Sequence, residues 1–164
     1  MTTMLTPTKL AEFFSRNLLT IKAQTKGLVH EQSLLQAPFR SNCLNWVLGH
    51  ILSSRDNVLN ALGAERVLTS EQSARYGYGS NPICGQEEGI LRMERILELL
   101  HLSQERLDAA LQTVTAATLE EERVMGPFHL PCGELIVQLF SHDSYHTGQT
   151  EILRQLAGTN DKVI

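Results

Sequence analysis

The chain has 164 residues, of which 42% are hydrophobic, and carries a formal net charge of −4 at pH 7. This size and apolar content predict one domain over residues 1–164. The acidic balance argues against a nucleic-acid partner, and no apolar stretch approaches the roughly 20 residues needed to span a bilayer. The N-terminus lacks the basic start and apolar core of a signal peptide, so we expect a cytoplasmic protein.

Two helices are expected in the first part of the chain. The first covers residues 7–26, with Thr6 as its N-cap. The second covers residues 42–62, with Ser41 as its N-cap and Gly63 after its end. Apolar residues lie on more than one side of the second helix. It is therefore expected to pack against more than one neighbour.

Two further helices are expected in the second part of the chain. The third covers residues 86–117, and its length of about 45 Å suits a bundle. The fourth covers residues 133–157, with Gly158 as its stop. Residues 76–82 are rich in turn-forming glycine and proline, and residues 124–132 form an irregular connection. The chain therefore belongs to the all-α class.

The three cysteines are Cys43, Cys84 and Cys132. Their odd number, wide spacing and lack of a C-x-x-C pair argue against a disulfide framework. We expect reduced, chemically inert thiols. A catalytic thiol is the alternative, but no nearby residue in the sequence marks one.

The fourth helix carries an unusual pair of histidines. His142 and His146 stand four residues apart, so their side chains project from one face of a helix. They belong to a predicted core-facing stripe of otherwise apolar residues, in which three consecutive positions are polar. An unpaired buried polar group costs about 1–3 kcal/mol, so the imidazoles need partners: a divalent metal, or hydrogen bonds to backbone, water or other side chains. The stripe comprises Leu135, Leu139, His142, His146, Gln149, Leu153 and Leu156.

Two histidines rarely suffice to hold an ion, so a third ligand should come from another helix. His50 is the best candidate because it is the only histidine in the second helix, although it lies opposite the main apolar stripe. Trp46, one turn earlier, shows that this face is not simply solvent-exposed. His30 and His101 are expected to be ordinary surface or boundary residues, and His129 is a minor candidate for the site. Without H-E-x-x-H or paired E-x-x-H motifs, a zinc protease and a carboxylate-rich di-iron centre are both disfavoured.

The segments Asn-Trp-Val-Leu-Gly-His-Ile (45–51) and His-Asp-Ser-Tyr-His-Thr-Gly-Gln (142–149) resemble signature regions of the DinB-like, or YfiT-like, metalloenzyme family. The resemblance covers essentially the whole chain. It implies a four-helix bundle of up-down-down-up topology and a homodimer. It also implies one divalent metal ion, nickel or zinc, held by His50, His142 and His146.

The resemblance further implies chemistry on a small-molecule substrate, because some relatives transfer low-molecular-weight thiols. Three neutral imidazoles would leave an ion with its positive charge and an open position, where a thiol or water loses its proton more easily. Thiol S-transfer is therefore the leading hypothesis. A non-catalytic, stress-related bundle with a structural metal and a metal-dependent hydrolase both remain open.

Several residues near the histidines are candidates for contacts with the metal ligands or the substrate. Gln149 is a candidate for contacting either a metal ligand or substrate, with an ordinary helix–helix hydrogen bond as the alternative. Tyr76 and Tyr78 are candidates for the mouth of the site, but packing is the expected role of both. Thr147, where relatives often have a basic residue, is expected to make an outward contact. Asp143 is expected to face away from the stripe, as is Glu151.

Overall fold

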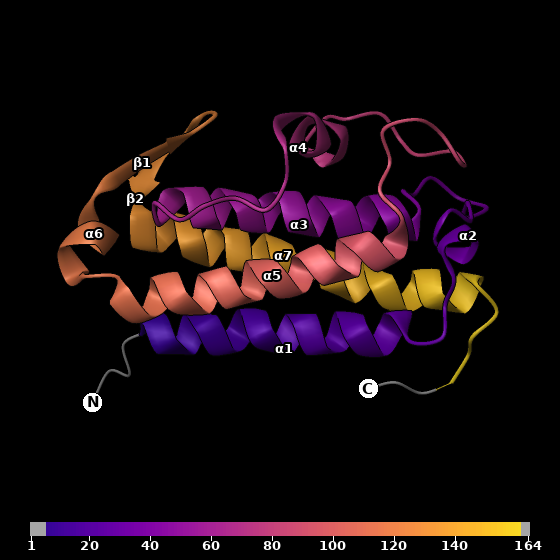
Figure 1. Cartoon of the computed structure of the whole chain (residues 1–164), viewed down its shortest axis with the longest axis horizontal. Coiled ribbons are helices and arrows are strands. Elements are labelled where there is room, and N and C mark those ends of the chain that lie inside the picture. Colours follow the sequence, from indigo (N-terminus) through magenta and orange to yellow (C-terminus); the bar gives the residue numbers. More distant parts are fainter. Residues whose placement is uncertain (1–5, 162–164) are drawn as a thin grey trace.

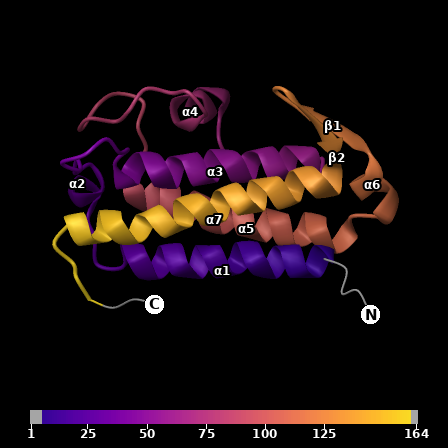
Figure 2. The ribbon, with the colours of Figure 1, turned by 180° about the vertical axis from the view of Figure 1, so that it is seen from behind.

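The computed structural model describes residues 6–161, so the ends of the expected 1–164 domain lie outside the described residues. Four long helices run side by side over this range, and α1 and α7 point in one direction while α3 and α5 point in the other (Figures 1 and 2). This arrangement confirms the expected all-α bundle of up-down-down-up topology. The long helices are α1 (Pro7–Thr25), α3 (Leu44–Ala61), α5 (Met93–Thr113) and α7 (Cys132–Leu156).

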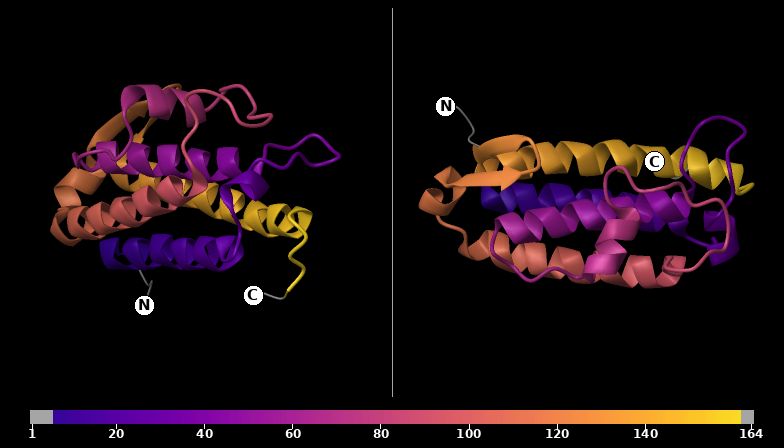
Figure 3. Two further views of the ribbon diagram at one scale, coloured as in Figure 1. Left: turned by 45° about the vertical axis from the view of Figure 1, so that its right-hand side comes forward. Right: turned by 90° about the horizontal axis from the view of Figure 1, so that it is seen from above.

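Shorter elements fill the connections. Helix α4 and the loops beside it lie along the outer side of α3 (Figures 1 and 3). An antiparallel hairpin occupies much of the stretch that was expected to be irregular, because Gly126, with a φ of 56°, permits a two-residue turn between Met125 and Phe128. These elements are α2 (His30–Ser33), α4 (Ser70–Tyr76), α6 (Ala116–Glu120), β1 (Glu122–Met125) and β2 (Phe128–Pro131).

The predicted bounds are correct for α1 and for the end of α3, whereas the start of α3 and both ends of α5 differ from the prediction. The Thr6 hydroxyl caps α1 by accepting a bond from the Lys9 amide at 3.2 Å. Cys43 rather than Ser41 occupies the N-cap position of α3, and its side chain makes no capping hydrogen bond. Helix α5 does not cover the predicted residues 86–117, because the backbone of its flanking residues, Arg92 and Val114, is extended.

His30 is buried, which corrects its predicted place at the surface or boundary. Its Nδ1 accepts a hydrogen bond from the Met93 amide at 3.1 Å, and its Nε2 lies 2.9 Å from Gln86 Oε1. Since the Met93 amide is one of the donors left without a partner at a helix start, His30 serves as a cap for α5. Its role is structural.

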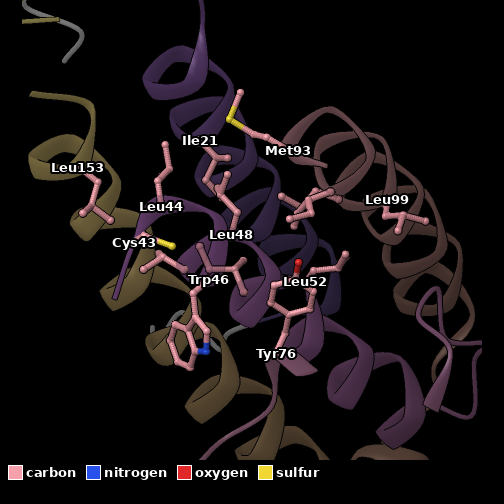
Figure 4. Packing of buried hydrophobic residues seen from close by; sticks show 14 of the residues in the cluster. Ile21, Cys43, Leu44, Trp46, Leu48, Leu52, Tyr76, Met93, Leu99 and Leu153 are labelled. Carbon is pink, nitrogen blue, oxygen red and sulfur yellow. The ribbon is translucent and has the colours of Figure 1, made fainter. Parts of the chain in front are cut away.

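The core is apolar toward both ends of the bundle. In Figure 4, residues from all four long helices pack together at one end, represented by Ile21, Leu48, Leu99 and Leu153. Helix α3 is buried over most of its circumference and packs against α4, α5 and α7, which confirms that it has several neighbours. None of the helices among residues 6–161 is long and apolar enough to cross a membrane.

Candidate metal centre

The antiparallel packing of α3 on α7 brings the three predicted histidines together. His142 Nε2 lies 3.2 Å from His50 Nε2 and 3.1 Å from His146 Nε2. Ligands at 2.0–2.1 Å around a tetrahedral ion are separated by about 3.3–3.4 Å, so the observed spacing is close to that of a metal site. The group His50, His142 and His146, called the histidine cluster below, can hold a metal ion.

Two of the rings have their tautomer set by a neighbouring oxygen. His50 Nδ1 donates to the Tyr76 carbonyl at 2.7 Å, because a carbonyl only accepts. His146 Nδ1 donates to Gln149 Oε1 at 2.8 Å. In both rings the proton sits on Nδ1 and the lone pair of Nε2 points into the cluster, as metal-binding histidines require.

Without a cation, the ring of His142 cannot satisfy the hydrogen-bonding capacity of the other two histidines. If His142 Nε2 carries a proton, it can satisfy only one of the two facing lone pairs well. His142 Nδ1 is buried and has no hydrogen-bond partner among the described residues. A divalent ion would satisfy all three Nε2 atoms together, and imidazole is a preferred ligand of zinc and nickel. The residues present therefore fit such an ion.

The electrostatic setting favours neutral imidazoles. Burial lowers the pKa of His50, His142 and His146, and it is the largest cause for each. Repulsion from a neighbouring histidine in the cluster lowers each pKa further. The Tyr76 carbonyl and the Gln149 side chain oppose this shift at His50 and His146, and the Asp143 carboxylate opposes it at His142 and His146. Neutral imidazole is the form that binds metal.

The ring of His50 is held by aromatic stacking. Trp46 stacks on it with ring centroids 4.5 Å apart and an interplanar angle of 17°. The Trp46 indole in turn donates to Ser80 Oγ at 3.0 Å. This hydrogen bond holds the loop after α4 beside the histidine cluster.

Tyr76 supports His50 through its backbone carbonyl. Its hydroxyl donates to Asn45 Oδ1 at 3.0 Å and accepts from the Leu91 amide at 2.7 Å, so the side chain is fixed in the core. Its ring lies against Gly49, where an added Cβ would stand only 2.1 Å from the ring. The predicted packing role of Tyr76 is confirmed. The sequence did not indicate that its carbonyl would orient His50.

Two pockets flank the histidine cluster along the groove between α3 and α7. The arginine-side pocket, of about 610 Å³, extends toward the start of α3, and the hairpin-side pocket, of about 530 Å³, extends toward β1 and β2. Tyr78 lines both pockets and is 99% exposed, so its predicted packing role is wrong. The arginine-side pocket includes Arg40, Ser41, Asn42, Trp46, Ser80 and Gln149. The hairpin-side pocket includes Ser53, Ser54, Asn57, Met125, Phe128 and Leu139.

A larger hollow, of about 650 Å³, lies between α1, α6 and the start of α7. Neither histidine nor cysteine lines it. The histidine cluster and its two pockets are therefore the better candidate site.

The histidines sit at the rim of the buried face of α7, which corrects the predicted stripe. The spacing of four and three picks out one line of residues along the helix, whereas the width and centre of the buried face depend on the neighbours against which α7 packs, here α1 and α3. In the structure that face continues through Asp143, Thr147 and Thr150, while His142 and His146 are half-buried. Thr147 is therefore a core residue and makes no outward contact.

Asp143 points into the bundle, where it belongs to a buried polar network that the residue pattern did not predict. Arg55 Nε donates to Asp143 Oδ2 at 2.7 Å, and Asn17 Nδ2 donates to Asp143 Oδ1 at 2.7 Å. The same guanidinium donates to the Phe14 carbonyl at 2.9 Å and to Gln104 Oε1 at 3.2 Å. The network joins all four long helices. Arg55, a charged residue within the mostly apolar α3, is the feature of the sequence that could have indicated this network.

The remaining candidates lie elsewhere. His129 is exposed on β2 and lies 3.8 Å from a Glu122 carboxylate oxygen. His101 is on α5 and outside the cluster, and Glu151 is exposed, as expected. The three cysteines are unpaired, as predicted, and burial raises the pKa of the Cys43 and Cys132 thiols. These two thiols stay protonated and are poor nucleophiles.

A family model described as the DinB superfamily matches residues 22–150. The matched range contains α3 with His50, the loop that carries Tyr78, and α7 through both of its histidines. The match confirms the resemblance seen in the sequence segments around these residues. Among curated proteins, none matches the chain significantly.

Proposed function

Because the chain belongs to the DinB superfamily, we propose that it binds one divalent ion, nickel or zinc, through His50, His142 and His146 and acts on a small molecule. The observation that carries the proposal is the convergence of three Nε2 atoms, two of them with their lone pairs directed inward by the Tyr76 carbonyl and Gln149. A bound ion would lower the pKa of a thiol or water that reaches it.

Thiol transfer is the chemistry that the site supports best. The thiol would lose its proton to solvent, its sulfur would bond to an electrophilic carbon, and the leaving group would depart with the electrons of its former bond. The chain's part is to hold the imidazoles in place and to admit both reactants through the pockets beside them. Low-molecular-weight thiols are the proposed co-substrate, because none of the three cysteines lines either pocket beside the histidines.

The alternatives receive less support from the geometry. Hydrolysis calls for a general base near the attacking water, yet neither pocket is lined by a carboxylate. The nearest acidic neighbour in sequence, Asp143, is engaged by Arg55 and Asn17. A purely structural metal is typically closed by a fourth protein ligand, and the group found among the described residues has three.

The homodimer remains a proposal drawn from the family. The apolar sides of α3 give it no separate support, because neighbouring helices of the same chain cover them. Sedimentation at the monomer mass of 18.3 kDa at micromolar concentration would contradict it.

Metal analysis of the purified protein tests the proposal most directly. We expect one ion per chain in the wild type and in the matched control His101→Ala. Stoichiometric binding should be lost in His142→Ala and in His146→Ala, because two imidazoles rarely hold an ion. Conjugation of a thiol to an electrophile should require the metal-loaded form and stop on chelation. Full metal content in His146→Ala would refute the assignment.

A further inference from the structure

The two pockets follow one another along a single groove, with the histidine cluster between them. His50, His142 and Tyr78 line both. On α3 the lining residues run from Trp46 in the arginine-side pocket to Asn57 in the hairpin-side pocket. A ligand held at the cluster therefore has two directions in which its remaining atoms can extend.

The arginine-side pocket has the chemistry of an anion site. Arg40 is the only lining residue with a permanent charge, and no carboxylate lines the pocket, although the chain as a whole is acidic. The Arg40 guanidinium forms no ion pair or hydrogen bond with any residue between 6 and 161. Its donors are free for an incoming carboxylate or phosphate, which arginine binds through two parallel hydrogen bonds. The Ser41 and Asn42 side chains beside it are neutral.

The hairpin-side pocket has the opposite character. No Asp, Glu, Lys or Arg lines it, and Met125, Phe128 and Leu139 give it apolar walls. The hydroxyl of Ser54 is buried and makes no hydrogen bond with the described part of the chain. Such a pocket favours an uncharged apolar or aromatic group, because burying a charge here would leave it without a partner.

We propose that the groove divides its ligands by charge, with an anionic group beside Arg40 and an uncharged apolar group beside the hairpin. This inference rests on the proposed function and names the substrate classes for it. The thiol carries the anionic group, and the second reactant carries the apolar one. Each ligand places its reactive end at the histidines and its recognition group in its own pocket.

Two thiols that differ in their tails test the division. 3-Mercaptopropionate and benzyl mercaptan are titrated into nickel-loaded protein, and the thiolate-to-nickel absorption gives each dissociation constant. Arg40→Gln should weaken 3-mercaptopropionate about tenfold, as expected for a lost charge-assisted bond, and leave benzyl mercaptan unchanged. Phe128→Ala should weaken benzyl mercaptan about fivefold and leave 3-mercaptopropionate unchanged.

Matched variants control for general effects. Arg16→Gln removes an exposed arginine from α1, and Val124→Ala shortens an exposed side chain on the same hairpin without touching the pocket. Both should bind the two thiols as the wild type does. Nickel content of every variant shows that the centre is intact.

The outcomes separate this inference from the function on which it rests. If both thiols bind nickel but each variant affects them equally or affects neither, the division by charge is refuted and the thiol chemistry stands. If neither thiol changes the absorption of wild-type nickel protein, the proposed thiol chemistry fails and this inference fails with it. Raised salt should weaken 3-mercaptopropionate more than benzyl mercaptan, since only the former has a carboxylate whose attraction to Arg40 is screened.

Discussion

Two polar clusters lie within one turn of each other on α7 and differ in how their atoms are bonded. In the buried polar network, both oxygens of Asp143 accept hydrogen bonds, from Arg55 and Asn17. In the histidine cluster, ring nitrogens face one another at 3.1 and 3.2 Å with more lone pairs than protons. A satisfied buried network holds the helices together, whereas unsatisfied acceptor lone pairs at the rim of a groove indicate a ligand.

The two clusters also differ in what surrounds them. The ion pair of Arg55 and Asp143 is closed, with side chains 0% and 1% exposed. The histidines open onto two pockets. Adjacent residues such as His142 and Asp143 reach such different surroundings because successive side chains on a helix point about 100° apart. Single substitutions can therefore disrupt either the buried polar network or the histidine cluster and leave the other intact.

The largest expected effect is on the buried network. Arg55→Met leaves the Asp143 carboxylate buried without its cation, which should lower the free energy of unfolding by about 3–5 kcal/mol. Urea denaturation of metal-free protein measures the loss. The exposed pair offers a matched control: Arg95→Met, which separates Arg95 from Glu98, should cost less than about 1 kcal/mol. An equally small loss for Arg55→Met would show that the network does not hold the bundle.

The second-largest effect is expected at Gly49, where packing of the Tyr76 ring supports the histidine cluster. Gly49→Ala places a Cβ against the Tyr76 ring and should destabilise the protein by about 1–3 kcal/mol through overpacking. Metal affinity should fall as well, because the Tyr76 carbonyl that orients His50 must shift. Calorimetric unfolding and metal titration measure both. In Gly148→Ala, the control on α7, the added Cβ meets no atom within 4 Å, so stability should be unchanged or slightly raised.

A third change separates binding from stability. Gln149→Ala removes the acceptor that fixes the His146 tautomer, so metal affinity should fall about 10- to 100-fold. The free energy of unfolding of the metal-free protein should hardly change, since Gln149 is only half-buried. Competition with a chelator gives the affinity. Gln112→Ala, on an exposed position of α5, is the control, and an affinity loss of the same size there would rule out the orienting role.

The smallest effect is on pH dependence. Because the pKa of each clustered histidine is lowered in the fold, the unfolded chain binds more protons as the pH falls. The stability that neutral histidines contribute is present above their ordinary pKa of about 6.5 and is lost as the pH falls through the lowered values. Denaturation of metal-free protein between about pH 7.5 and 5 measures this. In His146→Gln the loss should be smaller than in the wild type, and an identical loss would contradict the prediction.

Local residue patterns were enough to predict much of the bundle. The apolar repeat correctly predicted the four long helices. Thr6 was correctly predicted as the N-cap of α1, because a capping hydroxyl accepts a hydrogen bond from an amide only a few residues away in the chain. The start of α5 could not be predicted in this way. It depends on His30, which is more than sixty residues away in the chain, and local patterns do not carry such contacts.

The sequence by itself determined the class of the fold and the two histidines of α7, because helical period and i, i+4 spacing are properties of neighbouring residues. Tertiary structure decided the rest. Only packing of α3 on α7 could bring His50 to His142 and Asp143 to Arg55. It also decided how far the core face extends around α7, because α1 and α3 both pack against this helix. That packing places the carboxylate in the core and the imidazoles at the open groove.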